Sequence, residues 1–372
     1  MANNSKQWID KLLNQAGIAV NGGNPWDIKI SNPDLYDRVK SQGSLGLGEA
    51  YMDGWWECER LDEFFYHLLS NRIEDKIGFS FPLLWEVVKA KIFNLQSLKR
   101  AFEVGKKHYD LGNDLFIPML GKSMAYSCGY WKKASSLDSA QEAKMDLICR
   151  KLDLKRGQKV LDIGCGWGSF AKYAAENYGV EVTGITVSKE QLEFAENICQ
   201  GLPVKFRLMD YRRLNEKFDH IVSVGMIEHV GVKNYRTYMK VAKRCLKENG
   251  LFLLHTIGGL KSGNTTDPWI NKYIFPNGMV PSLKQLAKSV EGLFVIEDLH
   301  NFGADYDKTL MAWHKNFKNA WPKLKKKYGK RFYRMWIYYL LSCAGAFRAR
   351  SLELWQIVLS PDGVGGGYKP VR

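Results

Sequence analysis

The sequence lacks the cysteine patterns that form disulfide frameworks in small domains or bind zinc. It has seven cysteines in 372 residues, an odd number, and no C-x-x-C pair. This usage is typical of reduced thiols in a cytosolic protein and argues against a disulfide framework or a zinc site. We therefore expect no metal ion.

Long apolar segments are also missing. The N-terminus lacks the charged and then apolar pattern of a signal peptide. The longest apolar run, residues 336–347, is too short to span a bilayer and contains Ser342 and Gly345. With 45% hydrophobic and 25% charged residues and no internal repeat, we expect a folded, cytoplasmic protein with one large domain and a smaller one.

Acidic residues are absent from residues 315–350, although this stretch holds eleven Lys or Arg residues interleaved with aromatic side chains. The whole chain carries a formal net charge of +15. A basic face rich in aromatics suits a nucleic-acid backbone or an anionic membrane surface. The membrane is favoured, because Trp and Tyr prefer the headgroup boundary and Lys and Arg are attracted to anionic lipid. A solvated helix face over ordinary core aromatics is the alternative.

What the sequence does contain is a glycine-rich turn, VLDIGCGWG at residues 160–168, between an apolar strand and a helix expected at 169–177. Glycines at alternate positions let the backbone approach a ligand and adopt positive φ, and the helix start presents free N–H groups. With Asp162 two residues before the first glycine, the spacing matches the first motif of S-adenosylmethionine (SAM) methyltransferases and differs from the dinucleotide pattern. A tight turn without a ligand is the alternative.

Strands and helices alternate after this turn. We expect strands at 180–186, 204–208, 218–224 and 251–257, and a helix at 189–200 that is capped by Ser188. This order predicts an α/β, Rossmann-like fold with a mostly parallel, doubly wound sheet. Ligands bind beyond the carboxyl ends of such strands. The residues expected at those ends are Gly164, Gly166, Gln191, Asp210, Glu228 and His255.

The N-terminal part has a different character. Residues 1–95 are predicted to form a small helical domain with amphipathic helices at 5–16, 61–69 and 83–93 and a glycine-rich turn at 43–48. We expect this domain to serve docking or dimerisation. A basic connector is predicted at residues 96–107, followed by the cofactor-binding domain at 108–372.

Nine segments from residue 108 onward follow the order seen in one family. They are HYDLGNDLF at 108–116, YSCGYW at 126–131, VLDIGCGWG at 160–168, GITVSKEQ at 184–191, SVGMIEHVG at 223–231, LLHTIG at 253–258, DPWINKYIFPNG at 267–278, HNFGADYDKTLMAWH at 300–314 and CAGAFRAR at 343–350. In these segments the chain resembles the bacterial cyclopropane-fatty-acyl-phospholipid synthases, which are related to the mycolic-acid cyclopropane synthases. Residues 1–95 resemble the helical extension of the bacterial members.

The resemblance implies transfer of a methylene group from SAM to the cis double bond of an acyl chain in a membrane phospholipid, by residues 108–372 acting as a catalytic domain with lipid-binding insertions. An unactivated alkene is a weak nucleophile, so it must be held in line with the sulfonium methyl group. Attack leaves a carbocation, which electron-rich side chains stabilise. A base must then remove a proton from the added methyl group so that the ring closes.

In this family bound bicarbonate is understood to be that base. Carried over, its site consists of Cys128, Glu228, His255, the backbone of Ile257, and Tyr306. We interpret Glu228 as an acceptor for the bicarbonate O–H, because two carboxylate-like anions side by side repel each other unless they share a proton. Cys343 lies in a matching segment and is a proposed catalytic residue, but the alkylation needs no thiolate, so a structural role is favoured.

The resemblance also implies the residues that contact SAM. Tyr126 and Ser127 would lie near its methionine end, together with the turn that contains Asp162. Gln191 would contact the ribose, because the second strand ends in Thr186 where an acidic ribose ligand is often found. Asp210 and Tyr211 would contact the adenine. The complete predicted set is Tyr126, Ser127, Asp162, Gly164, Cys165, Gly166, Gly168, Thr186, Gln191, Asp210 and Tyr211.

The implied partners are an anionic bilayer, bound peripherally at its inner face, and a second copy of the chain. Three alternatives stay open. An RNA methyltransferase would share the turn and the charge, but we find no base-stacking Asn-Pro-Pro-Tyr motif or RNA module, so we expect no nucleic-acid partner. A small-amine methyltransferase would not need the basic aromatic stretch. A catalytically inactive lipid-binding protein would not need every predicted site residue.

Overall fold

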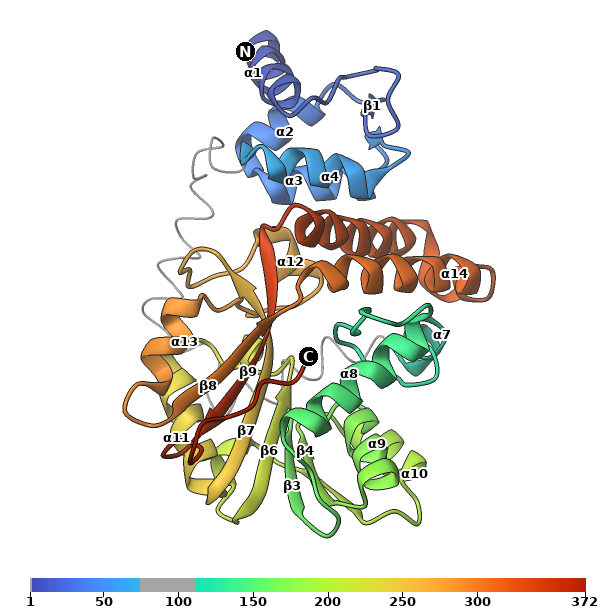
Figure 1. The fold of residues 1–372 in the computed structure, drawn as a ribbon. Coiled ribbons are helices and arrows are strands. Elements are labelled where there is room, and N and C mark those ends of the chain that lie inside the picture. Colours follow the sequence, from blue (N-terminus) through green and yellow to red (C-terminus); the bar gives the residue numbers. More distant parts are fainter. Residues whose placement is uncertain (1, 74–111) are drawn as a thin grey trace. The chain divides into compact units, whose positions relative to one another are not determined.

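The computed structural model describes residues 2–73 and 112–372 (Figure 1). These residues form two compact units. The sheet unit contains residues 112–264, 277–305 and 353–372, and the helical unit contains residues 2–73, Thr265–Pro276 and Tyr306–Leu352. The predicted helix at 83–93, the connector at 96–107 and both predicted domain boundaries lie outside the described residues.

The sheet unit is organised around a seven-stranded sheet in the order β5-β4-β3-β6-β7-β9-β8. Its strands are β3 (Lys159–Ile163), β4 (Glu181–Thr186), β5 (Val204–Leu208), β6 (Phe218–Val224), β7 (Leu246–Gly259), β8 (Val295–Asn301) and β9 (Leu352–Ser360). The pairs among β3 to β7 are parallel, whereas β8 and β9 are antiparallel. The predicted Rossmann-like, mostly parallel sheet is therefore confirmed.

Helices cover both faces of this sheet (Figure 1). On one face Leu161 and Ile163 of β3 pack with α11 and α13, and on the other Val160 packs with α8 and α9. Successive side chains of a strand point to opposite faces of the sheet, so strands that are buried on both faces contribute to both cores. The helices are α7 (Asn113–Leu120), α8 (Leu137–Lys151), α9 (Ser169–Tyr178), α10 (Lys189–Ile198), α11 (Tyr235–Cys245) and α13 (Leu283–Val290), with short 3-10 turns η2 (Tyr211–Arg213), η3 (Ile227–His229) and η4 (Val232–Asn234).

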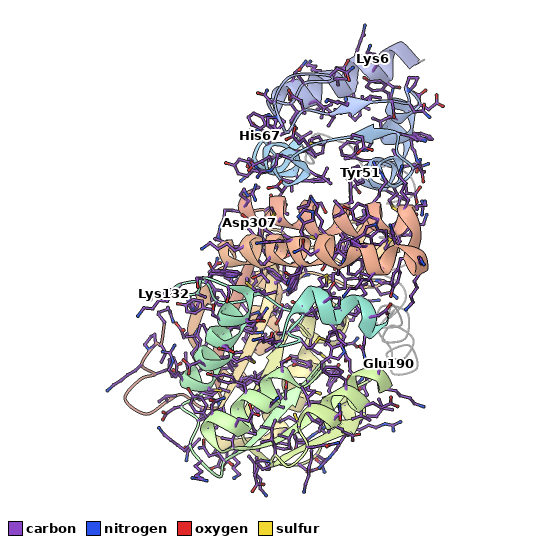
Figure 2. The ribbon with its side chains drawn as sticks, turned by 90° about the vertical axis from the view of Figure 1, so that its right-hand side faces the viewer. Lys6, Tyr51, His67, Lys132, Glu190 and Asp307 are labelled. Carbon is purple, nitrogen blue, oxygen red and sulfur yellow. The ribbon has the colours of Figure 1, made fainter. Side chains whose placement is uncertain are left out.

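The helical unit joins the N-terminal helices to two later segments. Its elements are α1 (Ala2–Gln15), β1 (Lys29–Ile30), α2 (Leu35–Gln42), α3 (Ser44–Met52), β2 (Trp56–Glu57), α4 (Leu61–Ser70), α12 (Pro268–Tyr273) and α14 (Ala304–Arg348). Gly329, with φ 73°, breaks α14 into two helices that lie side by side in Figure 1. Figure 2 shows Tyr51 of α3 beside α14, where the Arg334 guanidinium lies 4.1 Å from the Tyr51 ring centroid.

The glycine-rich turn predicted at residues 43–48 is wrong in its extent. Only Gly43 makes the turn, with φ 58°, and α3 begins at Ser44. The later glycines provide close packing instead. A Cβ on Gly46 would lie 2.5 Å from the Arg38 carbonyl oxygen, and one on Gly48 would lie 2.4 Å from the Trp269 ring.

The basic stretch at residues 315–350 separates its charges from its aromatic rings. Lys325, Lys326 and Lys327 are exposed, whereas Phe317 and Trp336 are fully buried. The rings pack on one another between the two halves of α14, as in the stacked pair Phe317 and Tyr333 with centroids 5.7 Å apart. These rings therefore belong mainly to the core. No helix among the described residues is long and apolar enough to cross a membrane.

Candidate active site

The glycine-rich turn follows β3 and leads into α9. Gly164 and Gly168 have φ 85° and 84°, and side chains there would collide with Met226 and Ala195, at 2.7 and 2.9 Å. Gly166 also has a positive φ, but a Cβ there would meet no atom within 4 Å. The turn thus leaves space beside its middle glycine, which is the feature that a cofactor loop requires.

Asp162 and Lys144 are a buried pair of opposite charge next to this turn. Asp162 lies on β3 and is 2% exposed, and Lys144 lies on α8 and is 3% exposed. Burial raises the pKa of Asp162 to about 7, and the Lys144 ammonium opposes that rise. Burial lowers the pKa of Lys144 to about 8. The Lys144 Nζ donates to Ser127 Oγ at 2.8 Å, so a predicted cofactor residue contacts this pair.

The end of β4 carries a second group of predicted cofactor residues. Ser188 caps α10 by accepting from the Gln191 N–H, which confirms the predicted cap. The Thr186 hydroxyl donates to Gln191 Oε1 at 2.8 Å, so this contact orients the Gln191 amide. Glu190, exposed on the same first turn of α10, is labelled in Figure 2.

The end of β5 places Asp210 and Tyr211 in η2. The Asp210 carboxylate accepts from the Arg212 backbone and from two atoms of its guanidinium, Nε and Nη2, each at 2.8 Å. Tyr211 is 4% exposed and packs on the Tyr238 ring. Both acidic oxygens are thus engaged by Arg212, and the adenine contact stays a prediction.

Tyr126 and Cys165 complete the predicted cofactor set. The half-buried Tyr126 ring packs edge-on against Phe116 of α7, with centroids 5.4 Å apart. Cys165 is buried within the turn, and burial raises the pKa of its thiol well above the usual value. It therefore stays a neutral thiol and is no nucleophile.

Glu228 follows β6 and is held by the backbone of β7. Its Oε1 accepts from the Ile257 N–H at 2.8 Å, whereas its buried Oε2 has no partner among the described residues. Burial raises the pKa of Glu228 to about 7. The Ile257 amide proton is used to orient Glu228 here, so a direct contact of Ile257 with bicarbonate stays a prediction.

His255 lies two residues before Ile257 on β7 and is 1% exposed. Its Nδ1 lies 3.3 Å from the Gln356 amide nitrogen of β9, and its buried Nε2 has no partner within the part of the chain that is described. Burial lowers the pKa of His255 well below its usual value, and the positive charges of Lys144 and Lys151 add smaller effects in the same direction. With the Gln356 amide donating to Nδ1, the neutral ring carries its proton on Nε2 and can donate it to a ligand.

Cys128 and Lys144 lie near this histidine. The Lys144 charge acts on both Cys128 and His255. The buried Cys128 thiol donates to the Gly129 carbonyl at 3.1 Å. Lys144 is therefore close to Ser127, Cys128, Asp162 and His255, and His255 lies two residues before the Ile257 amide that holds Glu228. Asp162, Glu228 and His255 lie near or after the carboxyl ends of parallel strands, where ligands were predicted to bind.

Tyr306 and Cys343 belong to the helical unit. The Tyr306 ring is 8% exposed and packs on Phe347 with centroids 4.5 Å apart. Burial raises the pKa of the Cys343 thiol to about 12. Cys343 is therefore a neutral thiol at ordinary pH, in keeping with the favoured structural role.

Three polar residues were missed by the sequence reasoning. Gln141, Lys144 and Gln356 are all at most 3% exposed. The first two lie on the buried stripe of α8, among Leu137, Ala140, Met145 and Ile148. A polar residue at an apolar position of an amphipathic helix is a signal that sequence alone provides, since burying it requires a partner.

The donors and acceptors of this site fit the two groups that the sequence predicted. The space at Gly166 and the charges of Asp162 and Lys144 fit an adenosyl amino acid. The unpartnered Glu228 Oε2 accepts a hydrogen bond and the unpartnered His255 Nε2–H donates one, which fits a small anion that has both O–H and C–O groups.

The fold and this site define the class of the protein: it is a SAM-dependent methyltransferase. A Mycobacterium tuberculosis cyclopropane synthase is similar in structure, with a TM-score of 0.66, 30% identity, and coverage of 69% of this chain and 97% of that one. Coclaurine N-methyltransferase has a TM-score of 0.70 but only 19% identity, over 84% of this chain and 98% of that one, and shows the fold alone.

The chain belongs to the mycolic acid cyclopropane synthetase family, whose family model matches residues 96–357. It is 58% identical to the cyclopropane-fatty-acyl-phospholipid synthase of Escherichia coli K12, over 98% of this chain and 95% of that enzyme. It is also 38% identical to a probable fatty acid methyltransferase of Pseudomonas putida, over 68% of this chain and 67% of that one.

Proposed function

We propose that this enzyme transfers a methylene group from SAM to the cis double bond of unsaturated acyl chains in membrane phospholipids and so forms a cyclopropane ring. The observation that carries the proposal is the pair of buried, unpartnered polar atoms Glu228 Oε2 and His255 Nε2. They are the groups that a mobile base would need. The 58% identical E. coli enzyme, a cyclopropane-fatty-acyl-phospholipid synthase, supports the substrate class.

In this proposal bound SAM supplies an electrophilic methyl group, and bound bicarbonate supplies the base. His255 Nε2–H donates to the anion, and Glu228 Oε2 accepts its O–H. The Ile257 N–H keeps Glu228 in place, and the Gln356 amide orients the His255 ring. Cys128 and Tyr306 are the remaining proposed ligands.

The raised pKa of Glu228, about 7, is part of this mechanism. A carboxyl group that is half ionised near neutral pH can share a proton with an anion instead of repelling it. Burial of His255 keeps its ring neutral, so that it does not neutralise the base. We propose that these residues move the proton away from the reacting carbon while excluding water.

We further propose that the enzyme is cytoplasmic and binds the inner face of the membrane peripherally. The exposed Lys325, Lys326 and Lys327 of α14 provide the charge for attraction to anionic headgroups. The N-terminal helices α1 to α4 are the proposed surface for a homodimer, which sedimentation at several protein concentrations would test.

The function is tested by incubating the protein with SAM and vesicles of an unsaturated phospholipid. We expect each modified acyl chain to gain one CH2 by mass and to show ring protons by NMR. A gain of the same mass with a surviving double bond would mean methyl branching without ring closure. Absence of any modified chain, with SAM still bound, would contradict the proposed substrate.

A further inference from the structure

Helix α8 holds the loop at residues 125–130 through several buried contacts. The Gln141 side-chain amide donates to the Ser127 carbonyl at 2.8 Å and to the Ala125 carbonyl at 3.4 Å. The Tyr130 N–H donates to the Ala140 carbonyl at 2.8 Å. A Cβ on Gly129 would lie 2.9 Å from the Ala140 Cβ, so helix and loop are in close contact.

Lys144 is one turn further along this helix and extends the same contact. Its ammonium donates to Ser127 Oγ at 2.8 Å, and the whole residue is 3% exposed. This is its one hydrogen bond to the residues that the structure describes, and an ammonium has three N–H donors. Burying a charge with so few partners is expensive, because the solvation that it loses is not replaced.

The charge opposite Lys144 is equally buried. Asp162, on the strand that leads into the glycine-rich turn, is close enough to Lys144 for each to shift the pKa of the other. No salt bridge within 4.0 Å joins the two side chains, both of which are described. An ammonium and a carboxyl group of opposite charge therefore lie near each other without a salt bridge, and Asp162 is on the strand that leads into the glycine-rich turn.

A zwitterion is complementary to such a pair. We propose that Lys144 binds the carboxylate of the amino-acid end of SAM, while Asp162 faces its ammonium group. The Ser127 hydroxyl, which accepts from Lys144, keeps its own proton for the same carboxylate. The inference rests on the proposed cofactor site and assigns to it a residue, Lys144, that carries the charge of recognition.

Lys151 provides an internal comparison because it lies two turns later on α8. It is 0% exposed, and burial lowers its pKa to about 7. Unlike Lys144, it is paired: its Nζ lies 3.7 Å from the Asp298 carboxylate and 3.2 Å from His300 Nδ1. Lys151 therefore has a structural partner, and we expect it to make no contact with the cofactor.

The test measures two ligands by calorimetry: S-adenosylhomocysteine, and its decarboxylated analogue that lacks only the carboxylate. We expect the wild type to bind the complete ligand at least about tenfold more tightly, since a buried charge-assisted hydrogen bond is lost with the carboxylate. In Lys144→Met and in Lys144→Gln, which retains a hydrogen-bonding side chain, this ratio should fall to about one. Lys144→Arg should restore part of it.

Lys151→Met is the matched control and should retain the wild-type ratio even if it unfolds at a lower temperature. The inference would be overturned if both neutral Lys144 variants kept the wild-type ratio of the two affinities. An equal fall in the affinities for both ligands would mean that Lys144 only supports the loop. A wild type that binds neither ligand would instead refute the cofactor site. A wild type that binds both but modifies no lipid would refute the proposed substrate and leave the Lys144 result valid.

Discussion

Two regions of this molecule differ in how completely their polar side chains are paired. In the helical unit the Arg348 guanidinium contacts three carboxylates, with Nε 2.9 Å from Asp307 and Nη1 2.8 Å from Asp62 and 2.7 Å from Glu63. In the sheet unit Glu228 and His255 each keep a buried polar atom without a described partner. Full pairing joins α4 to both ends of α14, whereas incomplete pairing marks the place where a ligand belongs.

The difference follows from what each region must do. Asp307, which is labelled in Figure 2, and Arg348 lie at opposite ends of α14, so their two hydrogen bonds tie its two halves together. Glu228 follows β6 in a connecting segment, and His255 lies near the carboxyl end of β7, where the sheet presents side chains to a ligand. A satisfied network stabilises the fold and has nothing left to bind, while the unsatisfied site is maintained by its rigid surroundings.

The sharpest test of the comparison is Glu228→Gln. We expect turnover to fall about 10²- to 10⁴-fold, the usual contribution of a positioned proton acceptor, while affinity for S-adenosylhomocysteine changes little. Kinetics on phospholipid vesicles and calorimetry measure the two effects. Glu216→Gln, at an exposed glutamate paired with Arg207 in the same unit, is the matched control and should retain full activity.

Removal of dissolved carbon dioxide should have the same effect as Glu228→Gln on the wild type. Bicarbonate added back should restore the wild type but rescue the variant poorly. A degassed wild type that keeps its full rate would point to Glu228 or His255 as the direct proton acceptor.

The paired region is tested by Arg348→Met. Removing one member of a partly buried network leaves the 2% exposed Asp62 carboxylate with less compensation, and we expect a loss of about 3–5 kcal/mol in the free energy of unfolding. Chemical denaturation measures it. Arg60→Met removes a half-exposed arginine from the same Asp62 and should cost about 1 kcal/mol or less. Equal losses in the two variants would show that the Arg348 network stabilises the fold no more than the exposed Arg60 pair does.

A pH series of the unfolding free energy tests whether Glu228 is a buried acid. The folded-state pKa of Glu228, about 7, is above its usual value of 4.5, so the folded protein retains a proton that the unfolded chain releases. Its contribution is therefore fully present below pH 4.5 and is lost as the pH rises to about 7, amounting to about 3 kcal/mol. Glu228→Gln should gain that much relative to the wild type between pH 4.5 and 7. A constant difference in unfolding free energy would show that Glu228 is not the buried acid inferred here.

The glycine-rich turn offers a test in which binding and folding separate. Gly166→Val should fill the space beside Gly166 and weaken S-adenosylhomocysteine binding at least about 100-fold, with a modest cost from its positive φ. Gly168→Val should lower the melting temperature as well, because its side chain would collide with Ala195 and Phe206. Unchanged affinity in folded Gly166→Val would remove the turn from the cofactor site.

The smallest effects are expected from the exposed lysines of α14. Replacing Lys325, Lys326 and Lys327 by Glu should weaken binding to anionic vesicles by about 1 kcal/mol per lysine at low salt, and by less at high salt. Vesicle flotation measures this. Equal flotation with neutral and anionic vesicles at both salt concentrations would leave the stretch as a solvated helix face.

Much of the sheet was predictable because its strands carry their own signal. The predicted strands at 204–208 and 218–224 coincide with β5 and β6, and Ser188 caps α10 as expected. β7 is longer than predicted because it begins at Leu246, which pairs with Phe218. The polar residues that follow, before the pairing resumes at Leu251, lie in an irregularity of the ladder and carry no apolar pattern. The turn at 43–48 was wrong because glycines there serve packing against Arg38 and Trp269, which local sequence does not reveal.

The sequence by itself determined the fold class, the glycine-rich turn and the types of residue at the strand ends, because these depend on short-range periodicity and spacing. Only the tertiary structure decided which polar groups are paired. The position of Lys144 on the apolar stripe of α8 indicates that it is buried, but only packing shows that it lies beside Ser127 and Asp162. Arg348 is paired with residues more than 280 positions away. Burial and pairing are set by long-range contacts, and they decide whether a charge supports the fold or binds a ligand.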